Sequence, residues 1–240
     1  MGGLRMNVAD HPDQAVFEGR EKFVVLAPHP DDESLACGAL LARAFAGAGA
    51  GAHVICLTNG SASHPGSRAW PPERLGVLRC AELTRAIECL GGTARDLTWM
   101  GLPDAALYRV DPQDVTARLE KTIARTGARH VFVPAREDHH EDHQATAAFA
   151  TALRTKRPDW IFHSYPVWSR WDDPDFANSI APYAPIFLAP EEHEARKRTA
   201  IAAHRSQLGQ VVADDPLGFV LPSGFIERFA SEDEIFWRMP

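Results

Sequence analysis

The chain has 240 residues and a formal net charge of −7. Its lysines and arginines form no cluster, and no apolar stretch approaches the ~20 residues that a membrane helix needs, so we expect neither a nucleic-acid partner nor a membrane span. The four cysteines lack CxxC spacing and follow no apolar signal-peptide run, which predicts reduced thiols in a soluble, cytoplasmic protein.

From residue 22 onward, short β-rich segments alternate with segments of helical spacing. We expect strands at 22–27, 53–58, 96–100, 129–133 and 160–165. We expect helices at about 33–46, 71–90, 111–126, 141–154 and 191–204. This alternation predicts a Rossmann-like, doubly wound α/β fold with a mostly parallel sheet and helices on both faces. Because there is no internal repeat or low-complexity linker, we expect one domain over 21–240, preceded by a flexible lead-in at 1–20.

Two clusters of histidines and acidic residues follow the first and fourth predicted strands. They are HPDDE at 29–33 and DHHEDH at 138–143. Either cluster alone is weak evidence, because Pro-Asp-Asp is also an ordinary turn and helix-start sequence and charged loops are usually only solvated. Ligands of doubly wound sheets bind beyond the carboxyl ends of the strands, so two such clusters at two strand ends together predict a metal site.

A catalytic zinc ion takes three protein ligands and keeps one position open for water. His29, Asp32 and His143 supply such a set, and the spacing of the first two lets them face one point where a loop tightens into a helix. Zinc lowers the pKa of its bound water from about 15.7 to about 7, which gives a nucleophile at neutral pH.

Three neighbouring residues are candidates for the chemistry around that ion. Asp31 points away from Asp32 and is the candidate general base. His140, one helical turn before the ligand His143, is expected to be a charged imidazolium that stabilises the oxyanion. Asp142 is expected to fix the tautomer of a histidine ring without itself binding the ion.

The segments APHPDDE at 27–33, HEDH at 140–143 and ARKRTAIAAHRSQ at 195–207 resemble the PIG-L/LmbE-like deacetylases. This family includes N-acetylglucosaminyl-phosphatidylinositol de-N-acetylases and deacetylases of mycothiol and bacillithiol synthesis, and the resemblance spans about 22–207. It implies one zinc ion per chain on His29, Asp32 and His143, with Fe²⁺ in its place left open. It also implies that Asp31 is the base and that His140 stabilises the oxyanion or protonates the leaving amine.

Three residues are candidates for substrate binding. The resemblance extends to an Arg-x-x-Glu pair formed by Arg79 and Glu82, in which Arg79 would reach substrate oxygens while Glu82 holds it; the alternative is a surface salt bridge. Arg68 lies in a long segment, 61–70, that we expect to overhang the strand ends. Trp168 is placed to stack on a sugar, against the alternative of rim packing.

Together these observations predict a hydrolase that removes an N-acetyl, or other N-acyl, group from an amino sugar or its conjugate, a small-molecule substrate. Two alternatives stay open. A two-histidine, one-carboxylate iron(II) oxygenase uses the same ligand types, although that chemistry is usually set in all-β barrels. A sugar-binding protein could retain the metal without catalysis, although it would need neither Asp31 nor His140. Assembly into homo-oligomers is also left open.

Overall fold

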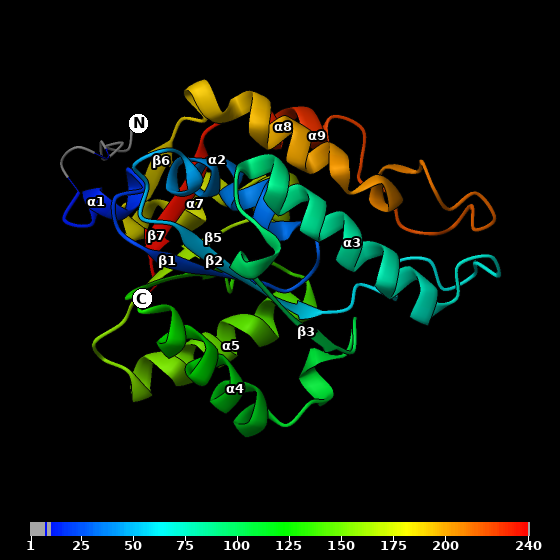
Figure 1. The fold of residues 1–240 in the computed structure, drawn as a ribbon, viewed down its shortest axis with the longest axis horizontal. Helices are drawn as coiled ribbons and strands as arrows, with labels where there is room; N and C mark the ends of the chain where they lie inside the picture. Colours follow the sequence, from blue (N-terminus) through cyan, green and yellow to red (C-terminus); the bar gives the residue numbers. More distant parts are fainter. Residues whose placement is uncertain (1–7, 9–10, 240) are drawn as a thin grey trace.

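The computed structural model describes residues 8 and 11–239 of the chain. Over these residues a single α/β domain forms around one seven-stranded sheet with the order β3-β2-β1-β4-β5-β7-β6 (Figure 1). The strands are β1 (Phe23–Ala27), β2 (Ala52–Thr58), β3 (Leu97–Leu102), β4 (His130–Pro134), β5 (Ile161–Tyr165), β6 (Ile186–Leu188) and β7 (Glu234–Arg238). The first five run parallel, whereas β7 is antiparallel to both β5 and β6.

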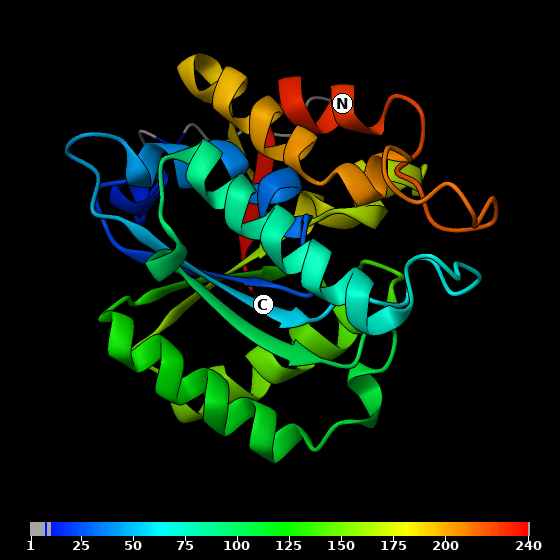
Figure 2. The same ribbon diagram turned by 45° about the vertical axis from the view of Figure 1, so that its right-hand side comes forward.

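Helices cover both faces of this sheet. They are α1 (Gln14–Phe17), α2 (Asp32–Phe45), α3 (Pro72–Leu90), α4 (Pro112–Thr126), α5 (Glu141–Lys156), α6 (Trp168–Asp172), α7 (Phe176–Ile180), α8 (Glu194–Ala203) and α9 (Phe225–Ser231). Figure 2 shows α3, α8 and α9 over one face and α4 and α5 over the other. Alternate residues of β1 point to opposite faces of the sheet: Val25 packs with α2 and α3, whereas Val24 packs with α4 and α5.

Local sequence signals set the ends of the long helices. The carboxylate of Asp111 accepts a hydrogen bond from Gln113 N (2.9 Å) at the start of α4. Gly91 and Gly127 end α3 and α4 in the left-handed conformation (φ 102° and 74°), which a residue with a Cβ adopts only at a cost.

The predicted fold class is confirmed, and each of the five predicted strands and five predicted long helices corresponds to an element of the structure. The sequence pattern missed β6, β7 and the short helices. Of the expected lead-in at 1–20, residues 1–7, 9 and 10 lie outside the described part, whereas α1 buries Val16 and Phe17 in the domain core.

The chain order of the strands creates a crevice at one end of the sheet. From β1 the sheet extends to β2 on one side and to β4 on the other, so β1 and β4 flank the topological switch point. The loops that follow these two strands therefore open onto the same crevice. No helix in the described part of the chain is long and apolar enough to cross a membrane.

Candidate active site

The loop after β1 and the start of α5 bring three candidate ligands together. His29 Nδ1 lies 3.2 Å from Asp32 Oδ2, and His143 Nε2 lies 3.3 Å from the same oxygen. The backbone N–H of His29 also donates to this oxygen (2.9 Å), which tightens the loop into α2. One buried carboxylate oxygen thus lies between an imidazole from the loop after β1 and one from α5, which follows the neighbouring strand β4.

A second carboxylate orients the ring of His29. Asp142 accepts a hydrogen bond from His29 Nε2 (3.1 Å) and others from the backbone N–H groups of Ala105 (2.8 Å) and Leu107 (2.9 Å). Because Nε2 is fixed by this bond, Nδ1 of His29 is turned toward Asp32, where it can hold either a proton or a metal ion. Asp142 thus meets the expectation of a ring-orienting carboxylate, although the ring is that of His29 and not of its sequence neighbour.

Asp138 has the same relation to His143. Its carboxylate accepts from His143 Nδ1 (2.9 Å), from Val167 N (3.0 Å) and from Ser169 N (2.9 Å). Nε2 of His143 is then the nitrogen turned toward Asp32, and it is fully buried and has no hydrogen-bond partner among the described residues. An unsatisfied buried nitrogen of this kind is costly, and a cation between His143, His29 and Asp32 would satisfy it, so these residues fit a metal ion.

The charges of this cluster support the same fit. Burial disfavours a charged imidazole, but hydrogen bonds with Asp142 and Asp32 outweigh it and raise the pKa of His29 to about 10. Burial also lowers the pKa of His143, but the carboxylates of Asp32 and Asp138 outweigh this effect and raise the pKa to about 9. The surrounding carboxylates therefore hold protons on both rings, and a metal ion would displace those protons.

Asp31 lies beside the cluster and faces a guanidinium. Its Oδ2 is 3.1 Å from Arg79 Nη2, and Arg79 is also held by the carbonyls of Gly60 (2.8 Å) and Pro30 (3.0 Å). Burial raises the pKa of Asp31 to about 6, although Arg79 lowers it; Asp32 adds to the rise. A carboxylate with this pKa gains and releases a proton close to neutral pH.

His140 caps α5 and lies over the other two histidines. Its ring centre is 4.5 Å from that of His29 and 5.3 Å from that of His143, and ligand atoms of the three residues lie within 4.8 Å of one another. Burial, and then the charges on His29 and His143, lower the pKa of His140 to about 4. The expected imidazolium is thus a neutral ring at pH 7. Its Nδ1 accepts from Asp142 N (3.2 Å), so Nε2 carries the hydrogen.

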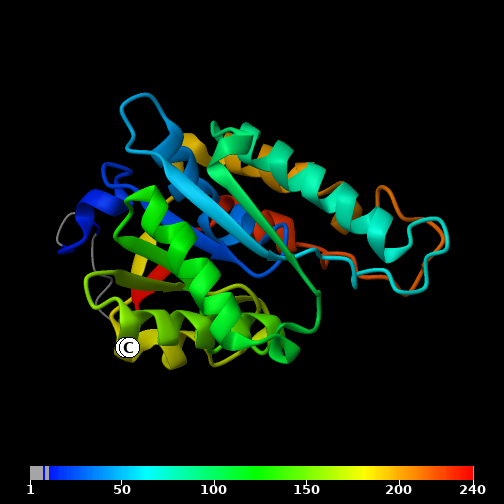
Figure 3. The ribbon, with the colours of Figure 1, turned by 60° about the horizontal axis from the view of Figure 1, so that its bottom comes forward.

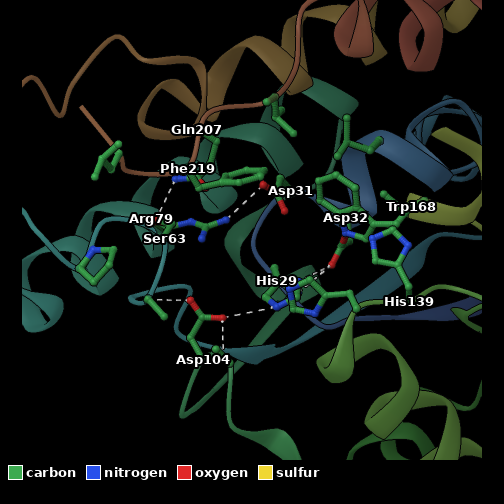
Figure 4. A pocket seen from close by; sticks show the side chains of 18 residues that line it. His29, Asp31, Asp32, Ser63, Arg79, Asp104, His139, Trp168, Gln207 and Phe219 are labelled. Atoms are coloured by element: carbon green, nitrogen blue, oxygen red, sulfur yellow. Dashed lines mark hydrogen bonds and ion pairs between the residues drawn. The ribbon is translucent and has the colours of Figure 1, made fainter. Parts of the chain in front are cut away.

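Four of these residues, His29, Asp31, Asp32 and His140, line a cavity of about 530 Å³ (Figure 4). Of the three predicted substrate-binding residues, Arg79 and Trp168 line it. Arg68 does not: its side chain is exposed, and its backbone N–H is bound by Asp214 (2.8 Å).

Sequence reasoning missed Asp104 at the cavity and gave Glu82 the wrong partner. Asp104, after β3, places Oδ1 3.4 Å from His29 Nε2, and its position directly beyond a strand end was the available signal. Glu82 does not hold Arg79; it accepts from the N–H (2.9 Å) and Oγ (2.6 Å) of Ser206. The next residue, Gln207, is buried and lines the cavity, and its Oε1 has no hydrogen-bond partner in the described part.

This geometry places the chain among doubly wound α/β proteins with a histidine–carboxylate site at the carboxyl ends of the central strands. The family model for PIG-L, described as GlcNAc-PI de-N-acetylase, matches residues 24–163, and the chain belongs to this family.

Relatives and solved structures agree with that assignment. The chain is 31% identical over 166 residues to the 1D-myo-inositol 2-acetamido-2-deoxy-alpha-D-glucopyranoside deacetylase of Rhodococcus opacus, covering 58% of this chain and 56% of that protein. The chain therefore spans little more than half the length of this relative. A protein of Bacillus cereus named "Probable N-acetyl-alpha-D-glucosaminyl L-malate deacetylase 2" is 27% identical, covering 80% of this chain and 86% of its own length. The N,N'-diacetylchitobiose deacetylase of Pyrococcus horikoshii shares the fold, with a TM-score of 0.68, 17% identity and coverage of 97% of this chain and 88% of that one.

Proposed function

We propose that this protein is a metal-dependent hydrolase that removes an N-acetyl, or other N-acyl, group from an amino sugar or its conjugate. The observation that carries the proposal is the buried, unpartnered Nε2 of His143, which faces the carboxylate between two oriented imidazoles. The ligands would be His29, Asp32 and His143, with zinc as the ion that best suits two imidazoles and one carboxylate. The printed names of the relatives from Rhodococcus and Bacillus, both deacetylases of acetylated glucosaminides, support the substrate class.

The ion would supply a water of lowered pKa and polarise the carbonyl of the scissile amide. The chain's own residues would then move the protons. Asp31, with a pKa of about 6, accepts the proton of the attacking water, and Arg79 fixes the orientation of its carboxylate. The Nε2–H of neutral His140 donates a hydrogen bond to the oxygen on which negative charge develops, or to the leaving nitrogen.

Polar groups on the cavity wall would recognise the sugar. Arg79, Ser63 and Asp104 gather on one side of the cavity, and the free Oε1 of Gln207 offers an acceptor for a sugar hydroxyl. A hydroxyl bound there would satisfy an acceptor that is otherwise buried without a partner. Trp168, on the opposite side, lies against the acyl end of the substrate in this arrangement.

The test is acetate release from N-acetylglucosamine and its glycosides, measured on protein as purified, after chelation, and after zinc is restored. We expect turnover that is lost on chelation and recovered with zinc. Asp31→Asn should retain the metal and lower kcat by roughly 10²–10⁴. Oxygen uptake in place of acetate release would favour the oxygenase alternative, and sugar binding without any turnover would favour a non-catalytic binding protein. Unchanged kcat in Asp31→Asn would remove Asp31 from its role.

A further inference from the structure

Asp31 occupies the N-cap position of α2, but in the described part of the chain its carboxylate makes no capping hydrogen bond. An aspartate at this position ordinarily accepts a backbone N–H of the first helical turn. Here the carboxylate is turned to Arg79, 3.1 Å away, in the cavity. Its backbone has φ 158° and ψ −28°, a combination outside the main regions allowed to residues with a Cβ. Surrounding contacts must therefore hold Asp31 in this conformation.

The side chain of Glu33 supplies one of these contacts. Its Oε2 accepts the backbone N–H of Asp31 (3.1 Å), which also points to the carbonyl of His29 (3.1 Å). Its Oε1 accepts from Ser34 Oγ (2.5 Å). Glu33 is fully buried and is not among the described residues that line the cavity. It therefore reaches the site only through the backbone of Asp31 and not by touching a substrate.

His204 lies against the other oxygen of the Glu33 carboxylate. Its buried Nε2 is 3.3 Å from Glu33 Oε1 and 3.3 Å from Ser34 Oγ. Two residues further on, the N–H and Oγ of Ser206 donate to Glu82 of α3 (2.9 and 2.6 Å). The chain directly after α8 is thereby fixed to both α2 and α3, and it holds the Glu33 carboxylate in place.

We propose that Glu33, held by His204, is a positioning residue for the general base, because it keeps the backbone of Asp31 in the conformation that turns its carboxylate into the cavity. The inference rests on the proposed function. Without an acceptor for its N–H, Asp31 relaxes toward an ordinary N-cap, in which its carboxylate binds the first turn of α2 and leaves Arg79. A displacement of about 1 Å in a reacting group can lower a rate about a hundredfold.

The test is a double-mutant cycle on acetate release from N-acetylglucosamine. Glu33→Leu removes both acceptor oxygens, and it should lower kcat about 10–100-fold with zinc content and KM unchanged. Glu33→Gln keeps one acceptor oxygen in a side chain of the same shape and should recover most of this loss. In the Asp31→Asn background, Glu33→Leu should lower kcat by less than about twofold, because no base is left to position.

Glu234→Leu is the matched control. Glu234 is another fully buried carboxylate that accepts N–H groups of α2, from Ala39 (2.7 Å) and Leu40 (3.0 Å), and it pairs with the buried Lys197. Its substitution should lower stability in urea unfolding but leave the kcat of the folded protein unchanged.

A pair of variants at His204 tests the same contact without altering the loop of the base. His204→Gln keeps an N–H donor near the position of Nε2 and should retain most of kcat, whereas His204→Leu should lower it about tenfold. This pair also decides the question if Glu33→Leu does not fold, because equal kcat in the two His204 variants would overturn the inference.

Each remaining outcome contradicts a different step. Unaltered kcat in Glu33→Leu would overturn the inference and leave the proposed function intact. A fall in kcat as large in the Asp31→Asn background as in the unaltered protein would show that Glu33 supports the fold and not the base. Loss of zinc from Glu33→Leu would assign Glu33 to the metal ligands. Absence of acetate release from the unaltered protein would instead overturn the proposed function itself.

Discussion

The domain contains a second histidine–carboxylate cluster at the opposite end of its sheet, and the two clusters differ in the hydrogen bonds and charge of their imidazoles. Ligand atoms of Asp13, His130 and His163 lie within 4.8 Å of one another, as those of the active-site histidines do. His130 begins β4 and His163 lies in β5, so this cluster faces the amino end of β4. Residue type and distance alone do not distinguish the two clusters.

Their hydrogen bonds do distinguish them. In the second cluster His130 Nδ1 and His163 Nε2 bind each other (3.0 Å), and Arg238 holds both oxygens of Asp13 (2.7 and 2.8 Å). Burial, reinforced by His130, lowers the pKa of His163 to about 3. The imidazoles are therefore neutral partners, and the carboxylate charge is balanced by a guanidinium. A site that can bind a metal ion instead needs outer carboxylates that fix one nitrogen of each imidazole and turn the other inward, as Asp138 and Asp142 do.

Removing one imidazole from each cluster gives the largest expected difference. His143→Asn should abolish zinc retention and lower acetate release by more than about a thousandfold, because the nucleophile depends on the ion. His163→Asn should retain the stoichiometric metal of the unaltered protein. Elemental analysis and acetate release measure both outcomes. Metal loss in His163→Asn with retention in His143→Asn would exchange the roles that we assign to the two clusters.

The outer carboxylates give a smaller effect. Asp142→Asn should weaken metal affinity by about 10–100-fold, because the ring of His29 loses the charged acceptor that fixes its tautomer. Asp13→Asn is the matched substitution in the other cluster and should leave the affinity unchanged. Competition with a chromogenic chelator measures both values. Equal affinities in the two variants would contradict the role of Asp142.

The pH dependence of stability gives the smallest effect and tests the second cluster. Because the native pKa of His163, about 3, lies below the ordinary value of 6.5, the native state binds fewer protons than the unfolded state below pH 6.5. Its contribution to stability is present above pH 6.5 and is lost as the pH falls toward 3. We expect a loss of about 2 kcal/mol between pH 8 and pH 5.

Urea unfolding at the two pH values checks this expectation. His163→Phe, which keeps the stacking on Phe132, should remove that part of the pH dependence. His139→Gln, a substitution of an exposed histidine, should keep it. A slope that persists in His163→Phe would show that other groups cause the acid sensitivity.

The comparison also shows which parts of the molecule could be predicted. The five parallel strands were predictable because strands buried on both faces are continuous apolar runs, as FVVLA in β1 is. Strand β7 was missed because it begins with Glu234, which is fully buried and paired with the equally buried Lys197 (2.7 Å). Sequence patterns place such charges at the surface, and only the tertiary partner reveals the exception.

The residues of the site likewise divide into those that the sequence marks and those whose role only the folded structure reveals. His29, Asp32, His143 and Asp31 are marked by their positions after two strand ends, and the structure brings them together. The orienting role of Asp138 could not be deduced, because it depends on backbone N–H groups from residues about 30 positions away. The neutral state of His140 likewise follows from charges that only the folded chain places around it.

The pairing of two long loops, 61–70 and 211–221, which project together in Figure 3, constrains how the cavity could be re-engineered. Asp214 satisfies the backbone of one loop from the other, about 145 positions along the chain. A chimera that receives only one loop from a relative would leave the N–H groups of Arg68 and Ala69 without their acceptor. Altered selectivity in this scaffold therefore requires grafting both loops as a unit.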